Sequence, residues 1–448
     1  RFAIEILQAI KRGAGSDIPV IYRIAPDHRV PGSRTLENCG PTFDVLSKAG
    51  VDAFDCDAGC YDVIDYIFPT QYLGDAPLAY VLPTVRKCTD KPLLNAGNHT
   101  PETAAELISS GKSDFVLFGR GLICDPDLPK KLMNGERENV RPCMRCLEEC
   151  VRRTVDRITK VSCALNPRVN EEMFFNIKKV EKPLNVMVVG GGPGGLEAAR
   201  VAALEGNTVH LYEKSGVLGG NMLVASTPDF KSPIQDLLKW YELQMKNTGV
   251  NVHMNAEIGA DDPRFEQADL IVMATGANEF VPRIPGVDGA NVVSVIDAHM
   301  NWDLVKGERI VVCGGGLSGC EAAYDLAKEK GMSVTVVEMG DKVLNGVFTI
   351  NADSLLRKMQ GYDITLRTSA RVTRVTEEGV YIEHDGQEEF LPCDTVIAAF
   401  GLTPNAKVAE AVRAKYPKKT WIIGDSEEIG NIGKAVRGGY YAAMSLID

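Results

Sequence analysis

Short apolar segments alternate with segments of helical period along the first 132 residues of the chain. The apolar segments have the length of buried strands, and between them apolar residues recur every three or four positions. The predicted strands cover residues 19–25, 52–58, 92–97 and 114–119. Thr100 and Pro101 supply an N-cap and a first-turn proline for the helix after the third strand. This alternation predicts parallel βα units.

Four such units match the second half of a (β/α)8 barrel, and a complete small open sheet is the alternative. The chain starts with RFAIEILQAIKRG, an amphipathic helix with neither an initiator methionine nor a capping residue. We therefore expect the chain to begin inside a domain, with a partial barrel over residues 1–132. The predicted fold class is α/β.

Two glycine-rich turns recur later in the chain, in VMVVGGGPGGLEAAR and IVVCGGGLSGCEAAY. Each turn follows an apolar strand, opens a helix and precedes a strand that ends in an acid, Glu213 or Glu338. The glycines of the GxGxxG pattern are Gly190, Gly192 and Gly195 in the first turn, and Gly314, Gly316 and Gly319 in the second. Strand, helix and distant acid together predict two dinucleotide-binding domains of Rossmann type.

The acid of the second turn bears on cofactor choice. Glu338 stands where a 2′-phosphate would have to be accommodated, and carboxylate and phosphate repel each other. Met339 and Gly340 follow, with no arginine to compensate the charge. The sequence therefore favours NADH over NADPH at this turn.

Four cysteines lie within 21 residues, in the pattern C-x2-C-x3-C-x12-C. Zinc ribbons prefer two C-x2-C pairs, and this segment has one, while a disulfide is uncommon in a nucleotide-binding chain of reduced compartments. Three close cysteines and a fourth from a nearby loop suit the corners of a cubane cluster. A [4Fe–4S] cluster is the favoured prediction, with zinc and free thiols as alternatives. Most other cysteines are expected in the core, whereas Cys39, Cys60 and Cys124 are expected near strand ends or loops.

Arg23 interrupts the otherwise apolar end of the first predicted strand. A buried guanidinium needs an anionic partner. The electron-rich N1–C2=O edge of a reduced flavin would supply one, and an ion pair with Asp55 or Asp57 is the structural alternative.

Further motifs make the chain resemble the flavoproteins with two dinucleotide-binding domains, the disulfide-reductase group. They are IVMATGA, DTVIAAFGLTPN and TWIIGDSE. The resemblance implies that the first glycine turn holds FAD and that the second, inserted one holds the nicotinamide cofactor. The implied FAD contacts are Gly190, Gly192, Gly195, Glu213, Asn221, Thr275, Gly276 and Asp425. The implied NAD contacts are Gly314, Gly316, Gly319, Glu338 and Gly401.

Over nearly its whole length, the chain resembles the Old Yellow Enzyme-related iron–sulfur flavoenzymes, which include 2,4-dienoyl-CoA reductase, 2-enoate reductase and trimethylamine dehydrogenase. The resemblance rests on LNAG and FVLFGRGLICDP, followed by RPCMRCLEEC and SCALNP and then the two glycine turns. The implied FMN contacts are Arg23, Gly97, Asn98, Gly119 and Arg120. The implied cluster ligands are Cys143, Cys146, Cys150 and Cys163. The implied domains are a partial FMN barrel (1–132), a cluster linker (133–180), an FAD domain (181–297 and 395–448) and an NAD domain (298–394).

The function implied by the resemblance is an NADH-dependent ene-reductase, acting on the activated double bond of an enoate, enoyl thioester or enone. Electrons would pass from NADH to FAD, then singly through the cluster to FMN, and on to the substrate. An amine dehydrogenase of the trimethylamine type and an electron-transfer module for a partner protein are the alternatives. The proton donor, a Tyr or His, is expected upstream of the given residues, so the sequence names no catalytic residue.

Charge and hydropathy narrow the choice of partners. A net charge of −11 argues against nucleic acid or an anionic membrane as the main partner. No apolar run has the length of a membrane span, and no signal-peptide pattern opens the chain. We expect a cytoplasmic enzyme with a small unsaturated substrate. The sequence leaves the oligomeric state, including a homo-oligomer, open.

Overall fold

The computed structural model describes residues 1–445 and divides into two compact units, Arg1–Leu122 and the part of the chain from Ile123 onward. The first unit is built on a four-stranded parallel sheet in the order β1-β2-β3-β4. Its strands are β1 (Ile21–Ile24), β2 (Ala53–Cys56), β3 (Leu93–Asn95) and β4 (Phe115–Val116). All four predicted strands are confirmed, with shorter bounds, and so is the α/β class.

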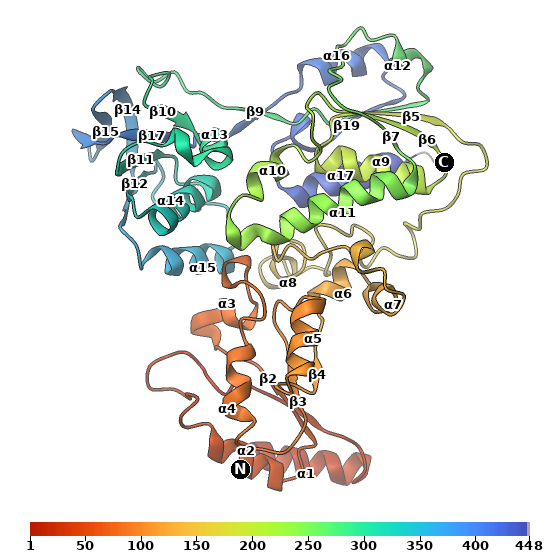
Figure 1. Cartoon of the computed structure of the whole chain (residues 1–448), viewed down its shortest axis with the longest axis vertical. Coiled ribbons are helices and arrows are strands. Elements are labelled where there is room, and N and C mark those ends of the chain that lie inside the picture. The colour runs from red at the N-terminus through yellow and green to blue at the C-terminus, as the bar shows by residue number, and fades with distance from the viewer. Residues whose placement is uncertain (446–448) are drawn as a thin grey trace. The chain divides into compact units, whose positions relative to one another are not determined.

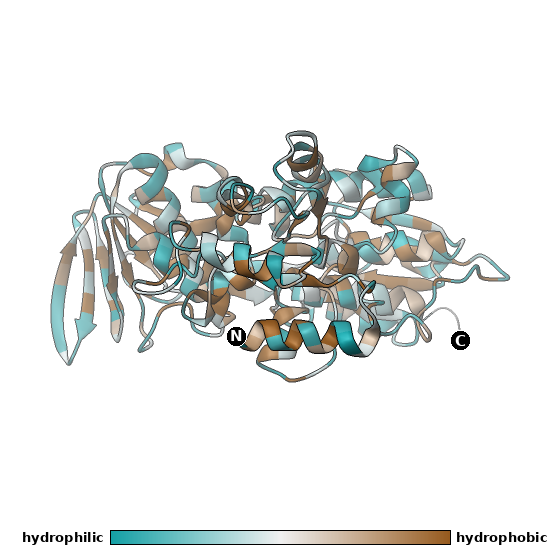
Figure 2. Cartoon of the chain, turned by 90° about the horizontal axis from the view of Figure 1, so that it is seen from below, coloured by the Kyte–Doolittle hydropathy of each residue, from teal (hydrophilic) through white to brown (hydrophobic). Residues whose placement is uncertain are grey.

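Helices separate the strands of the first unit (Figure 1). They are α1 (Phe2–Ala14), α2 (Gly40–Lys48), α3 (Ile64–Ile67), α4 (Leu82–Val85) and α5 (Pro101–Ser109), with 3-10 turns η1 (Tyr61–Val63), η2 (Gln71–Leu73) and η3 (Ala79–Val81). Thr100 caps α5 through its side chain, as predicted. Helix α1 carries both polar and apolar residues (Figure 2). Of its apolar residues, Leu7 is buried, whereas Phe2 and Ile6 are exposed. The core lies between the sheet and the helices, around Phe43 and Phe54.

The second unit begins with short helical pieces that carry the cysteine segment. They are α7 (Leu128–Met133), η4 (Arg137–Asn139) and α8 (Val151–Val155), after α6 (Arg120–Cys124), which crosses from the first unit. The segment packs on the rest of the unit at several points. Trp240 Nε1 donates to the carbonyl of Asn139, and Asn351 Nδ2 donates to the carbonyl of Cys146.

A five-stranded parallel sheet in the order β19-β8-β5-β6-β7 forms the first nucleotide-binding layer. Its strands are β5 (Asn185–Val189), β6 (Thr208–Tyr212), β7 (Asn251–His253), β8 (Leu270–Met273) and β19 (Thr420–Ile422). The accompanying helices are α9 (Pro193–Leu204), α10 (Asn221–Ala225), α11 (Ser232–Thr248), α12 (Arg264–Gln267), α16 (Lys407–Lys415) and α17 (Ile432–Met444), with η5 (Asp229–Lys231) and η7 (Gly424–Ser426). Helices α9 and α17 pack closely, because a Cβ on Gly439 would lie 2.1 Å from the carbonyl oxygen of Gly194.

A second parallel sheet, in the order β10-β17-β11-β12-β13, repeats this architecture. Its strands are β10 (Val292–Ser294), β11 (Arg309–Cys313), β12 (Ser333–Val337), β13 (Ile364–Arg367) and β17 (Thr395–Ala398). Its helices are α13 (Val295–Met300), α14 (Leu317–Lys330) and α15 (Thr349–Met359), with η6 (Trp302–Leu304). Strands β10 and β17 lie outside the range 298–394 expected for the NAD domain, yet both pair in this sheet.

Two smaller sheets complete the second unit. An antiparallel sheet, β14-β15-β16, consists of β14 (Ala370–Thr376), β15 (Gly379–His384) and β16 (Gln387–Pro392). An antiparallel ribbon pairs β9 (Ala277–Glu279) with β18 (Leu402–Pro404). This ribbon carries both connections between the two parallel sheets (Figure 1). No helix among residues 1–445 is both long and apolar enough to cross a membrane.

Candidate functional site

The first glycine turn joins β5 to α9 and leaves its helix N-terminus open. Gly190 has φ +109°, and a Cβ on Gly195 would lie 1.9 Å from the carbonyl oxygen of Gly190. Only glycine permits this close approach of helix and strand. A Cβ on Gly192, the N-cap of α9, would meet nothing within 4 Å. The turn therefore fits the pyrophosphate of a dinucleotide, which binds at an open helix N-terminus.

Glu213 lies at the end of β6 and holds this turn. One carboxylate oxygen accepts from the backbone N–H of Gly191 at 2.7 Å, and the other accepts from the N–H of Ser215 at 2.8 Å. The side chain is buried. Each carboxylate oxygen has a further lone pair, so Glu213 can hold the turn and still accept from a ribose hydroxyl.

The second glycine turn, between β11 and α14, has the same construction. A Cβ on Gly319 would lie 2.0 Å from the carbonyl oxygen of Gly314, and Gly316 again faces open space. Glu338 accepts from the N–H of Gly315 at 2.8 Å and from that of Gly340 at 2.7 Å. This turn therefore also fits a dinucleotide.

The remaining residues expected around FAD and NAD lie on several elements of the second unit. Thr275 Oγ1 donates to the carbonyl of Asn405 at 2.8 Å, next to Gly276, and Gly401 accepts a backbone bond from Phe280. Asn221 opens α10. Asp425 Oδ1 accepts from the N–H of Gly430 at 2.9 Å, and burial raises the pKa of its carboxyl. The structure contains no cofactor, so their cofactor contacts stay predictions.

A buried ion pair joins η5, which belongs with the first parallel sheet, to α14, which belongs with the second. Lys231, at the end of η5, pairs with Glu321 on α14, and both side chains are buried. Asp325, one turn further along α14, is buried as well, and burial raises its pKa to about 7. Sequence reasoning missed this pair, because 90 residues separate its partners and no local pattern links them.

The cysteine segment brings its four predicted ligands near one another. Burial, with the neighbouring sulfurs of Cys150, Cys143 and Cys163, raises the pKa of Cys146. The residues on both sides of Cys146 have left-handed backbone conformations, with φ +59° at Arg145 and +60° at Leu147. Within residues 1–445, no three His, Cys, Asp or Glu side chains form a group that could hold a single metal ion.

These thiols lie in an apolar environment. Cys143, Cys146 and Cys163 pack against the main core of the second unit, beside the buried Met144 and Leu165. All twelve cysteines of the chain lie among the described residues, and none forms a disulfide. Neighbouring sulfurs against an apolar core fit an iron–sulfur cluster, whose potential depends on such burial.

A fifth cysteine, which sequence reasoning placed near strand ends or loops, lies in the core against which three of the predicted ligands pack. Cys124 is the last residue of α6 and is 1% exposed. A hydrogen bond with Cys124, together with backbone donors at Leu165 and Asn166, lowers the pKa of Cys163 to about 7. No local sequence signal distinguishes Cys124 from a core cysteine, because its partner lies in a distant loop.

Arg23 of the first unit lies in the ion-pair arrangement named as the structural alternative. It donates to Asp55 at 2.8 Å and also to Asp57, and its side chain is 51% exposed. The expectation of a buried guanidinium is therefore wrong: the Arg23 side chain is half exposed, and the carboxylates of Asp55 and Asp57 balance its charge. The FMN contact of Arg23 stays a prediction.

The other expected FMN residues gather after β3 and β4. Arg120 donates to Asn98 Oδ1 at 2.9 Å and to the carbonyl of Pro69 at 2.7 Å. Asn98 has φ +50°, and Gly97, which precedes it, has φ +108°. A Cβ on Gly119, just before α6, would meet nothing within 4 Å. Open space at Gly119 beside an arginine fits a phosphate, the group expected after the last barrel strands.

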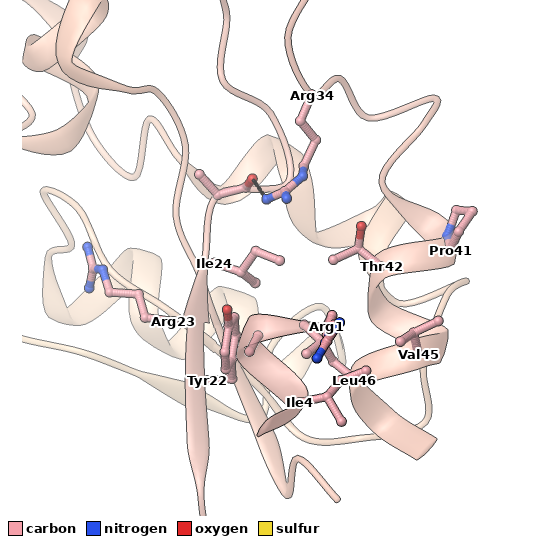
Figure 3. A pocket seen from close by; sticks show the side chains of 12 residues that line it. Arg1, Ile4, Tyr22, Arg23, Ile24, Arg34, Pro41, Thr42, Val45 and Leu46 are labelled. Carbon is pink, nitrogen blue, oxygen red and sulfur yellow. Dashed lines mark hydrogen bonds between the residues drawn. The ribbon is translucent and has the colours of Figure 1, made fainter. Parts of the chain in front are cut away.

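A pocket of about 510 Å³ lies elsewhere in the first unit, between β1, α1 and α2. Tyr22 and Ile24 point toward it, whereas the guanidinium of Arg23 lies on the opposite side of the strand (Figure 3). Arg34 lines the pocket and donates to the carbonyl of Ala25 at 3.1 Å. Arg23 is thus among the residues that line the pocket, although its guanidinium points away from it.

Comparisons with known proteins cover both units. Residues 1–139 match the model of the NADH:flavin oxidoreductase / NADH oxidase family, and residues 184–427 match that of pyridine nucleotide-disulphide oxidoreductase. The segment between these two ranges, which holds the four cysteines, is matched by neither model.

Similar proteins align over the full chain. It is 33% identical to cinnamate reductase of Clostridium sporogenes and 32% identical to NADH oxidase of Thermoanaerobacter brockii, covering 100% of this chain and 69% of each relative. A solved structure of 2-naphthoyl-CoA reductase in complex with 2-naphthoyl-CoA superposes with a TM-score of 0.91 at 28% identity, covering 99% of this chain and 67% of that one.

Proposed function

Because the chain belongs to the NADH:flavin oxidoreductase / NADH oxidase family, we propose that it is an NADH-driven reductase of activated carbon–carbon double bonds. It is an oxidoreductase that works with flavin and a nicotinamide cofactor. Cinnamate reductase and 2-naphthoyl-CoA reductase are named for an unsaturated carboxylate and an aromatic thioester. The substrate class proposed here is therefore an enoate, an enoyl thioester or an enone.

The observation that carries the proposal is the pair of glycine turns, each closed by a carboxylate at the end of the next strand. We assign FAD to the turn of Gly190 and NADH to the turn of Gly314, with the domain ranges expected from the sequence, except that β10 and β17 join the NAD domain. The open helix N-terminus at each turn binds a pyrophosphate, and each glutamate accepts from a ribose hydroxyl. Glu338 also disfavours a 2′-phosphate, so NADH is preferred to NADPH.

A cluster and a second flavin complete the proposed enzyme. Cys143, Cys146, Cys150 and Cys163 would hold a [4Fe–4S] cluster, because their sulfurs are neighbours and three of them pack against an apolar core. Asn98, Gly119 and Arg120 would hold the phosphate of FMN. When bound, FAD would supply a hydride acceptor for NADH, the cluster would supply single-electron transfer, and FMN would supply a hydride donor for the double bond.

Two groups of paired charges would hold parts of the proposed enzyme in place. Buried Lys231 and Glu321 fix η5 against α14, and this contact sets the position of the NADH turn relative to the first sheet. Arg23, held by Asp55 and Asp57, keeps a positive charge at the carboxyl end of β1, where barrel enzymes place their chemistry. The twelve thiols would remain reduced in the cytoplasm, the compartment we propose.

An anaerobic titration of the full-length holoenzyme tests the proposal. NADH should bleach the flavin absorbance, and cinnamate, an enoyl thioester or an enone should restore it. Iron and acid-labile sulfide should be present in a ratio of about one to one, the composition of a [4Fe–4S] cluster. Bleaching that no alkene reverses would contradict the ene-reductase assignment. Bleaching by an amine in place of NADH would indicate the amine dehydrogenase.

A further inference from the structure

The loop after β1 holds an arginine against two tyrosines. The guanidinium carbon of Arg29 lies 4.2 Å from the ring centre of Tyr66 and 5.5 Å from that of Tyr80. Both distances are in the range of a cation–π contact. Arg29 has φ +59°, a left-handed conformation that is uncommon outside glycine. The loop and the two rings therefore hold this side chain in one place, although the residue is exposed.

Most of the donor capacity of Arg29 is unused. One guanidinium N–H donates to Tyr80 Oη at 3.2 Å, and this hydroxyl donates to Asp27 Oδ2 at 2.7 Å. Burial raises the pKa of Tyr80 to about 12, so the phenol stays neutral at physiological pH. Within residues 1–445, the Arg29 side chain forms no ion pair and donates no other hydrogen bond. A guanidinium has five N–H donors, so most of them remain open to an anion.

This arginine lies at the carboxyl end of the first sheet, where the FMN site is proposed. The carbonyl of Asp27, after β1, accepts from the N–H of Gly59, after β2, at 2.8 Å. Arg23 and Asp57, which pair with each other, come from the ends of the same two strands. Barrel enzymes form their sites from the loops at this end of the strands. Arg29 therefore belongs to the loops that would surround a substrate on the proposed FMN.

We propose that Arg29 binds the anionic end of the substrate and thereby selects charged over neutral alkenes. The inference rests on the proposed function, because it takes the loops after β1 and β2 as the entrance of the ene-reductase site. The fork of an arginine pairs with two oxygens of a carboxylate or a phosphate, and stacking on aromatic rings keeps the fork in place. The anion is the carboxylate of an enoate or a phosphate on the carrier of an enoyl thioester. A neutral enone has neither.

Steady-state kinetics of the full-length holoenzyme test the role with three substrates of one skeleton: cinnamate, cinnamoyl-CoA and benzylideneacetone, a neutral enone. Arg29→Met removes the charge and the donors from a side chain of similar length. The ratio of kcat/KM for an anionic substrate to that for the enone should fall roughly tenfold to a hundredfold, mainly through KM. Arg29→Lys should retain part of the preference, because it keeps the charge without the fork. A larger fall for cinnamate would identify a carboxylate as the anion, and a larger fall for cinnamoyl-CoA a phosphate.

Arg12→Met is the matched control, because Arg12 is also exposed but lies in the last turn of α1, ahead of the amino end of β1. Its ratios should equal those of the wild type. Wild-type ratios in Arg29→Met would overturn the role, because Arg29 would then only support its loop. If Arg29→Met does not fold, Arg29→Lys decides by the same ratios, which should fall by a smaller factor, and unchanged ratios would overturn the role. A wild-type holoenzyme that reduces none of the three substrates with NADH would instead overturn the proposed function.

Discussion

The two glycine turns are almost the same in geometry and differ in the charges buried on their helices. In α9, Glu197 pairs with Arg200 one turn away, so the buried charges are compensated within the helix. In α14, Glu321 is paired with Lys231 of another element, and Asp325 has a raised pKa. The turn itself prepares a nucleotide site, whereas the buried charges determine how each helix is attached to its surroundings.

The helix ends differ as well. Helix α14 ends at Gly331 in a left-handed conformation, with Lys328 and Lys330 in its last turn. Both features suit the negative end of a helix dipole. Helix α9 instead ends at Glu205, a fully buried carboxylate whose oxygens have no hydrogen-bond partner among the described residues. A larger share of the residues of α9 than of α14 is thus buried, but the C-terminal end of α9 is the less favourable of the two.

Replacement of the third glycine of each turn by alanine should have the largest effect. It should affect a different cofactor at each of the two turns. Gly195→Ala should abolish FAD binding, because the new Cβ would lie 1.9 Å from a carbonyl oxygen. Gly319→Ala, with the same clash, should keep FAD but slow its reduction by NADH by roughly a hundredfold. Flavin content and stopped-flow absorbance measure these effects. Gly361→Ala, in open space, is the control. Rapid reduction in Gly319→Ala would contradict the NADH assignment.

Removal of Lys231 should destabilise the protein by about 3–5 kcal/mol, because it leaves a buried carboxylate without its cation. Lys231→Met should therefore lower the thermal midpoint, and the double variant Lys231→Met/Glu321→Leu should recover most of the loss. Lys239→Met removes an exposed lysine near Asp236 and should change stability by less than about 1 kcal/mol. Calorimetry of the holoenzymes compares the three. A double variant no more stable than the single would argue against a buried pair.

Replacement of Glu338 should change the choice of nicotinamide cofactor. Glu338→Arg offers a cation to a 2′-phosphate, so the NADPH/NADH ratio of kcat/KM should rise at least roughly tenfold, or about 1.4 kcal/mol. Glu338→Ser should raise it less, while its loss of the bonds to Gly315 and Gly340 should weaken NADH binding. Glu257→Arg provides the same charge change at an exposed position. An unchanged ratio in Glu338→Arg would mean that the ribose lies elsewhere.

The effect of replacing Glu205 should depend on pH. Burial raises the pKa of its carboxyl to about 7, above the value of about 4.3 for an unfolded glutamate. The folded state thus holds its proton more tightly, and stability is lost as pH rises from 4 through 7. Glu205→Gln should stabilise the protein by roughly 1–3 kcal/mol at pH 8 and by much less at pH 5.

Thermal midpoints at these two pH values measure the change, with Glu242→Gln as an exposed control. A gain of equal size at both pH values would show that the Glu205 carboxyl does not titrate between them.

Local pattern was sufficient for the strands and the glycine turns. Each turn depends on neighbours in sequence: a strand, the glycines, a helix and an acid some 20 residues on. The four strands of the first unit could be located for the same reason, since each is a short apolar run between helices. Their exact ends could not, and the predicted residues 19–25 contain the shorter strand Ile21–Ile24.

Contacts between distant segments could not be predicted in this way. The pair of Lys231 with Glu321 and the bond of Asn351 to the carbonyl of Cys146 join residues far apart in sequence, and neither has a repeating pattern. For Arg23, the contact could be predicted from the sequence but the exposure could not. Its ion-pair partners were named from the sequence, but its exposure depends on which face of the sheet is covered, and that is a property of the whole unit.

The ribbon of β9 and β18 has a consequence for how such an enzyme can evolve. Ala277 lies opposite Pro404, so the chain leaves the first sheet and returns to it at adjacent points. Nearby, Thr275 and Asn405 bond to each other's carbonyls. A segment with adjoining ends can be inserted, lost or exchanged without disturbing its host. The second glycine turn is thus part of a transferable cassette, and a change of electron donor could come from recombination at these two points.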